Sequence, residues 1–247
     1  MSRWKAASIH LSISIAVGLL VFALLFLIWF PQPYFNAAGG QHLILVLLGV
    51  DLVLGPMLTL ILFKSGKKGM LFDLCLIGFV QSAALVYGMH VITQSRPVFV
   101  VAVVDRFNVI TPADLDPSDL AEGTKPEFRS LSWTGPRIIA AQLPQSGEER
   151  THLMFQGPGG KDVQNYPKYY VDYREEAQNL LTRAKPIASL RSMHPNAMPI
   201  LDQWFAEHQR KETEVAWVPV VTLKSSFTML LDKQTGEVLD ALPIYPW

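Results

Sequence analysis

The sequence predicts a membrane protein in which three transmembrane α-helices precede an α+β extracytoplasmic domain that ends in a β-meander. Three observations support this prediction. Residues 1–94 contain three apolar runs, and each approaches or exceeds the roughly 20 residues that cross a bilayer. Lysines cluster between the second and third runs, whereas the loop between the first and second carries no charge. Residues 95–247 combine β-branched runs with amphipathic segments, which indicates a folded domain outside the bilayer.

The apolar runs define a three-helix membrane region at residues 1–94, with spans at about 9–30, 43–63 and 70–92. Trp4 and Trp29 flank the first span, as interfacial aromatics do. A cleaved signal peptide is the competing interpretation of this run. We favour a retained anchor, because the run exceeds the roughly 7–15 residues of a signal-peptide core and Pro31 follows it.

Basic residues predict the orientation of these spans. Arg3 and Lys5 precede the first span, and the turn at 64–69 (KSGKKG) carries three lysines. Cytoplasmic loops of membrane proteins are enriched in Lys and Arg. We therefore expect a multi-pass protein whose N-terminus and lysine turn are cytoplasmic. The uncharged loop at 31–40 and all residues after 92 then lie on the outer side.

Asp51 is the polar residue of most interest within the spans, in the segment 49–56 (GVDLVLGP), with Pro56 about one turn deeper. A carboxyl at this depth costs about 3 kcal/mol on insertion scales, so it should face protein or a water-filled cleft. At 1.5 Å per residue, Asp51 and Gln81 lie about 13 and 16 Å below the outer ends of their helices. They can therefore meet. Either they hydrogen-bond each other within the bundle, or Asp51 meets a polar group on the membrane helix of a partner.

Charge and cysteine content exclude several classes of function. Residues 1–94 hold five Lys/Arg against two Asp/Glu, a formal charge of +3, and residues 95–247 hold sixteen against nineteen, a charge of −3. A nucleic-acid partner would need a clustered basic surface, which neither part has. The single cysteine, Cys75, lies in the third span, so we expect neither a disulfide framework nor a CxxC redox site.

The sequence of the outer domain, residues 95–247, predicts strands and helices in the following order. A buried strand at 98–104, broken at 105–107, continues at 108–110, and we expect it to pair with the C-terminal meander. Thr111 and Pro112 begin a short helix to residue 120. The remaining predicted elements are a strand at 137–143, helices at 146–155, 173–184 and 199–211, and strands at 215–224, 227–232 and 237–240. Pro219 suggests an edge or a bulge in the first strand of the meander.

We find no catalytic, metal or cofactor signature in this domain. Its histidines, His152, His194 and His208, are scattered without ligand spacing. The glycine-rich segment 157–160 lacks the following GK[ST] of a phosphate-binding loop, and GxSxG is absent. The sequence therefore predicts a protein that is not an enzyme and has no evident small-molecule substrate.

Adjacent charges at Asp105 and Arg106 have two interpretations. They can form an ion pair at a strand end, which is the commoner explanation of neighbouring opposite charges. They can also form a recognition patch that faces the membrane. We favour the ion pair.

Two stretches resemble a known family. The segment 49–56, together with RPVF at 96–99 and VDRF at 104–107, is similar to the TfpX/TfpZ-family type IV pilin accessory proteins. The loop WFPQPYF at 29–35 and the order of three helices and then an outer domain fit as well. The resemblance covers the whole chain, but the motifs lie in its first 110 residues.

The resemblance implies an inner-membrane protein of Gram-negative bacteria, in contact with membrane lipid, that assists assembly of a cognate major type IV pilin. The outer domain would be periplasmic. A pilin waits in the membrane by one apolar helix, which in that family usually carries a glutamate, and Asp51 would satisfy that polar group. No catalytic residue, metal or cofactor comes with the family. The candidate partner-binding residues are Asp51, Gln81, Pro56, Arg96, Asp105 and Arg106.

The alternative function is a membrane-anchored envelope sensor or structural subunit that binds another periplasmic partner. A third and weaker possibility is an envelope enzyme whose active site the sequence does not reveal. Co-purification with a pilin would separate the first function from these two.

Overall fold

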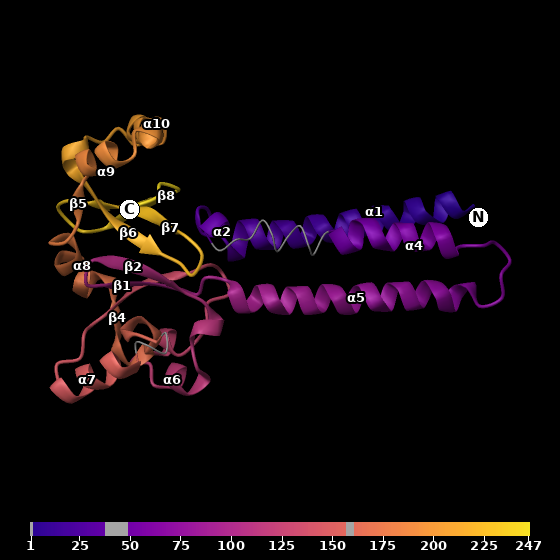
Figure 1. Ribbon diagram of the computed structural model, residues 1–247, viewed down its shortest axis with the longest axis horizontal. Coiled ribbons are helices and arrows are strands. Elements are labelled where there is room, and N and C mark those ends of the chain that lie inside the picture. Colours follow the sequence, from indigo (N-terminus) through magenta and orange to yellow (C-terminus); the bar gives the residue numbers. More distant parts are fainter. Residues whose placement is uncertain (1, 38–48, 157–160) are drawn as a thin grey trace.

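The computed structural model describes residues 2–37, 49–156 and 161–247. Figure 1 shows an elongated molecule with a bundle of long helices at one end and a β-sheet domain at the other. The N-terminus lies at the end of the helices that is remote from the domain, and the C-terminus lies within the domain. The chain changes from helix to sheet between Ser95 and Phe99.

Two helices have the length and apolar composition of a membrane span. The first comprises α1 (Arg3–Leu24) and its π-helical continuation η1 (Leu25–Trp29), and the second is α5 (Met70–Ser95). Between them lie α2 (Tyr34–Ala37), the π-helical η2 (Val50–Leu54) and α4 (Gly55–Leu62). The predicted span at 43–63 appears as a shorter apolar helix, Asp51–Leu62, and its first residues, 43–48, lie outside the described ranges. That span stays a prediction.

The helices are joined along their length and at the end next to the domain. Figure 1 shows α4 running beside α1, with α5 on the other side of the bundle. Nδ1 of His10 in α1 and Oγ1 of Thr59 in α4 lie 2.7 Å apart. At the other end, an apolar cluster links η1, the loop before α2, α2 itself and α5; its buried members are Leu25, Trp29, Phe30, Phe35 and Ile92.

The domain is built on one mixed sheet. Its strands are β1 (Phe99–Val103), β2 (Arg106–Ile110), β3 (Arg137–Ala141), β4 (Tyr170–Asp172), β5 (Lys185–Pro186), β6 (Val215–Val221), β7 (Ser226–Asp232) and β8 (Val238–Leu242). Their order is β4-β3-β1-β2-β6-β7-β8, and β5 pairs with β6 off this path. The β1–β3 and β2–β6 pairs are parallel, and the others are antiparallel.

Helices cover both faces of this sheet. Successive side chains of a strand point to opposite faces. Accordingly, Phe99 and Val101 pack in one core with residues near α6 (Pro117–Ala121) and in α7 (Gly147–Gln156), whereas Val100 and Ala102 pack in another with α8 (Tyr173–Leu181). A third core lies between β6–β8 and the helices α9 (Ile187–Met193) and α10 (Met198–His208). Trp217 and Leu230 of this third core alternate with Val218 and Met229 of the α8 core, so α9 and α10 cover the same face of the sheet as α6 and α7. Figure 1 shows the two pairs of helices at opposite ends of the sheet, α9 and α10 near β6–β8 and α6 and α7 near β4.

Two expectations about β1 and the segment after it are wrong. The strand at 98–104 does not continue through 108–110 but turns back at Val104, whose φ is +55°, so β1 and β2 form a hairpin. It is β2 that pairs with the meander, through Phe107 and Val220, while β1 lies between β2 and β3. The predicted helix 112–120 is divided into a 3₁₀ turn, Pro112–Asp114, and α6, because the residue before Pro117 is held extended.

The other predicted elements are confirmed with small changes in their bounds, whereas β4, β5 and α9 were not expected. Pro219 lies inside the sheet rather than at its edge. On the side of β6 away from β7, β5 pairs at residues 216–217 and β2 at 220–221. Pro219 therefore falls where β6 changes partner, which is a position at which a missing N–H donor is tolerated.

Candidate functional site

A cavity of about 160 Å³ lies between α1, η2 and α5. We call it the interhelical cleft. Its walls combine polar side chains with small and apolar ones: His10, Ile13, Ser14, Val17, Asp51, Gly78, Gln81, Ser82 and Leu85. The structure thus brings together Asp51 and Gln81, the two residues that their matched depths predict to meet.

The contact between these two residues differs from the predicted pairing. Nε2 of Gln81 donates to the backbone carbonyl oxygen of Asp51 at 3.5 Å, near the long limit for a hydrogen bond. The Gln81 side chain also interacts with the Asp51 carboxyl, but Oδ1 of that carboxyl is buried without any partner. A buried oxygen without a donor costs about 1–3 kcal/mol. The carboxyl therefore retains an unused acceptor in the cleft.

Pro56 explains why Gln81 reaches the backbone. In a π-helix each carbonyl accepts from the N–H five residues later, and for Asp51 that residue is Pro56, which has no N–H. In an apolar environment a neighbouring side chain can satisfy such a freed carbonyl. Gln81 supplies that donor from α5. Pro56 thus acts through local helix geometry, not as a side chain that lines the cleft.

Gly55 makes room for this arrangement. A Cβ placed on Gly55 would lie 2.0 Å from Nε2 of Gln81, which is far inside van der Waals contact. Any larger residue at position 55 must therefore displace the Gln81 amide. Gly55 was not singled out in the sequence, since nothing local shows which side chain approaches it.

His10 and Ser14 form the α1 wall of the cleft and were also missed as site residues. Ser14 is buried, and His10 contacts Thr59 as described above. The signal that could have found them is their spacing of four residues, which places both side chains on one face of an apolar helix.

Arg96 lies at the junction of helices and domain and is only 2% exposed. Its Nη1 donates to the carbonyl of Thr93 at 2.6 Å, and its Nε donates to the carbonyl of Ser132 at 3.2 Å. The guanidinium lies 4.3 Å from the ring centre of Trp133 and 5.7 Å from that of Trp29. Burial lowers the pKa of Arg96. These contacts assign Arg96 a structural role, and its contact with a partner stays a prediction.

Asp105 and Arg106 form the ion pair that we favoured. Nε and Nη2 of Arg106 donate to the two carboxylate oxygens at 2.8 and 3.2 Å, and this holds the pKa of Asp105 below its usual range. The alternative, a recognition patch that faces the membrane, stays a prediction, and the position of the pair does not favour it. Because β1 leads away from α5, the β1–β2 turn lies at the end of the sheet remote from the helices (Figure 1).

The domain also has a cavity of about 860 Å³ between α8, β3 and the β7–β8 turn, and no histidine, cysteine or serine lines it. Within the described ranges, no group of three or more His, Cys, Asp or Glu side chains could hold a metal ion. The interhelical cleft therefore remains the candidate site.

The fold and the cleft define a class: a protein with apolar helices of membrane-spanning length, a polar cleft between them, and an attached mixed-sheet domain. The family model described as fimbrial assembly protein FimB matches residues 1–39. The fimbrial assembly proteins of Dichelobacter nodosus serogroups I and E1 are each 30% identical to this chain over 233 residues, which is 93% of this chain and 90% of theirs.

A third relative, the fimbrial assembly protein of Dichelobacter nodosus serogroups C1 and C2, is 36% identical over 113 residues, 45% of this chain and 86% of its own. No solved structure matches significantly. The chain belongs to the FimB family of fimbrial assembly proteins. The resemblance to type IV pilin accessory proteins is thereby confirmed.

Proposed function

We propose that this chain is an assembly factor for type IV pili, and that its interhelical cleft receives a polar side chain from the apolar helix of a cognate major pilin, which packs beside the cleft. The observation that carries the proposal is the unpartnered Oδ1 of Asp51, buried in the cleft of a fimbrial assembly protein. A partner helix that donates a hydrogen bond to this oxygen would relieve its desolvation. The helix would therefore be recognised through one polar group within an apolar surface.

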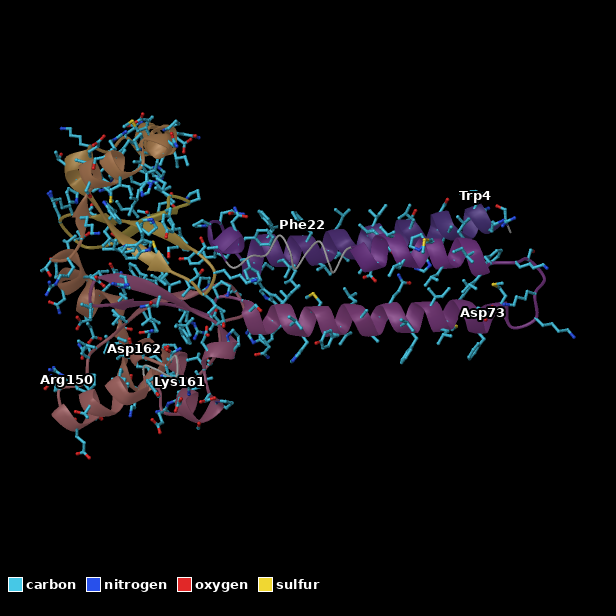
Figure 2. All side chains as sticks on the ribbon, viewed as in Figure 1. Trp4, Phe22, Asp73, Arg150, Lys161 and Asp162 are labelled. Atoms are coloured by element: carbon cyan, nitrogen blue, oxygen red, sulfur yellow. The ribbon has the colours of Figure 1, made fainter. Side chains whose placement is uncertain are left out.

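The proposed setting is the inner membrane, crossed three times. The segment that contains η2 and α4 would form the second span beside α1. Figure 2 places Trp4 and Asp73 at the same end of the bundle, remote from the domain, with Phe22 closer to the domain. Asp73 pairs with Lys67 of the lysine turn, so the basic residues of the membrane region gather at that end. The positive-inside rule then orients the sheet domain toward the periplasm.

This orientation predicts the behaviour of reporter fusions. A reporter that is active only in the periplasm should be active when fused after Trp247. The same reporter inserted in the lysine turn at 64–69 should be silent, because that turn is cytoplasmic in the proposed topology. Enzyme activity normalised to fusion protein abundance measures both, and the reverse pattern would contradict the topology.

Occupation of the cleft predicts site-specific cross-linking. A photo-reactive amino acid at Ser82, which lines the cleft, should capture the cognate pilin in intact cells. Val80 is the matched control, since it is 57% exposed and lies roughly 200° around the same helix. The measurement is the mass shift of the chain on a blot probed for pilin.

Equal capture of pilin from Ser82 and Val80 would show that the cleft is not the binding site. Capture of a different envelope protein at Ser82, with no pilin, would favour the alternative function of a sensor or structural subunit.

A further inference from the structure

The end of the sheet domain next to the helices exposes two large apolar side chains that no residue of the described ranges covers. Leu223, in the turn between β6 and β7, is 94% exposed, more than any other large apolar side chain in the described residues. Trp133, in the loop before β3, is 61% exposed. One exposed apolar side chain needs no explanation, but apolar side chains that gather beside the ends of apolar helices indicate a surface for a membrane or a partner.

Both side chains lie where the helices join the domain, although their loops are far apart in sequence. The ring centre of Trp133 is 6.0 Å from that of Trp29. In the same loop, a Cβ on Gly135 would lie 3.4 Å from the carbonyl oxygen of Ile28. The loop that carries Trp133 is thus packed against the last turn of η1.

The turn that carries Leu223 is fixed to the chain that follows the first helix. Oγ1 of Thr222 donates to the carbonyl of Ala37 at 3.0 Å, and the ring of Tyr34 lies 5.2 Å from that of Phe227. Leu223 also lines a cavity of about 170 Å³ together with Tyr34 and Val109, so apolar surface continues from the turn toward the helices. Lys224 adds an exposed positive charge next to Leu223.

The chemistry of these residues fits a lipid surface. Tryptophan is enriched at the membrane–water interface, where the polar edge of its ring remains hydrated. An extended leucine fits the acyl chains just below, and a neighbouring lysine fits anionic headgroups at the surface. Because η1 and α5 end at this level, the loops 132–135 and 222–225 would meet the bilayer into which the helices insert.

We propose that Trp133, Leu223 and Lys224 form a lipid-docking surface that holds the sheet domain against the outer leaflet. The proposal goes beyond pilin binding and depends only on insertion of the helices. The orientation of the domain over the bilayer would then be set by three contacts between domain and helices: those of Arg96 with Trp29 and Trp133, of the Trp133 loop with η1, and of the Leu223 turn with Ala37.

The single native cysteine allows a direct test. In a Cys75→Ser background, Leu223→Cys is labelled with an environment-sensitive fluorophore, and the full chain is reconstituted in phosphatidylethanolamine and phosphatidylglycerol vesicles. Leu143→Cys is the matched control, since Leu143 is 50% exposed and follows the end of β3 remote from the helices. Nitroxide-labelled lipids should quench the fluorophore at position 223 several-fold more than that at 143, with iodide showing the opposite order.

A third sample reports whether the helices are inserted. It is the wild-type chain labelled at Cys75, which is exposed on α5. Strong lipid quenching at Cys75 with equal, weak quenching at 223 and 143 would overturn the docking surface and leave the proposed insertion intact. Protection of position 223 from iodide only after co-reconstitution with pilin would also overturn it, because the surface would then bind a protein rather than lipid. Absence of lipid quenching at all three positions would refute docking and insertion together.

Discussion

An Arg96→Ala variant is expected to unfold at a temperature roughly 10 °C below that of the wild-type protein. The substitution removes the hydrogen bonds to Thr93 and Ser132 and the contacts of the guanidinium with Trp133 and Trp29. Hydrogen bonds to a charged group contribute about 1.5–3 kcal/mol each, offset here by the desolvation that the variant avoids, so we expect a net loss of about 3 kcal/mol. For a domain of this size, each kcal/mol lowers the melting temperature by roughly 2–4 °C.

Thermal unfolding of the detergent-solubilised chain, followed by tryptophan fluorescence, measures this loss. Arg137→Ala is the matched control, because Arg137 donates to the carbonyl of Ser130 in the same region but at the surface. Its effect should be within about 0.5 kcal/mol, as for most surface substitutions. Arg96→Lys should recover little, since an ammonium cannot reproduce two directed bonds and a stacked plane. Wild-type stability of Arg96→Ala would show that the junction does not depend on this side chain.

An Asp51→Leu variant is expected to lose most surface pili while its own abundance stays normal. Gln81 donates to the Asp51 backbone carbonyl, and that carbonyl remains after the substitution. The helix contact should therefore survive, whereas the carboxyl that is proposed to meet the pilin is gone. An unsatisfied partner group in the cleft costs about 1–3 kcal/mol, which corresponds to roughly 5- to 150-fold weaker binding. Asp51→Asn keeps an acceptor of the same shape and should retain pili.

Blots of membranes and of sheared pili from the same cells separate this effect from a packing defect. Gln81→Leu should lower the abundance of the chain itself, because an interhelical hydrogen bond in lipid is worth about 0.6–2 kcal/mol. Gly55→Ala should do the same by displacing the Gln81 amide, and the two changes together should be no worse than Gln81→Leu alone. Gly49→Ala is the control, since among the described residues no atom beyond its neighbours and its own helix backbone lies within 4 Å of a Cβ placed there. Normal pili in Asp51→Leu cells would exclude Asp51 from the mechanism.

The sequence by itself determined the features that depend on composition and on neighbouring residues. Apolar composition over more than 20 residues predicted the helices Arg3–Trp29 and Met70–Ser95. Two short runs rich in apolar residues, 227–232 and 237–240, and the turn between them at 233–236 predicted the hairpin of β7 and β8. Helix rise alone predicted that Asp51 and Gln81 meet, because two antiparallel helices that start at the same level match residues of equal depth.

Only the tertiary structure decided the contacts between distant segments. The order of strands places β2 rather than β1 beside β6, and it depends on a hairpin turn at Val104. A β-branched residue rarely adopts the positive φ of such a turn, so the sequence does not predict it. The burial of Arg96 requires Trp29 and Trp133 to converge from separate segments, and periodicity carries no information about such a meeting. Contacts between distant segments also determine that Gln81 donates to the backbone carbonyl of Asp51. Pro56 frees a carbonyl in one helix, Gly55 opens the path to it, and the donor that completes the bond belongs to a different helix.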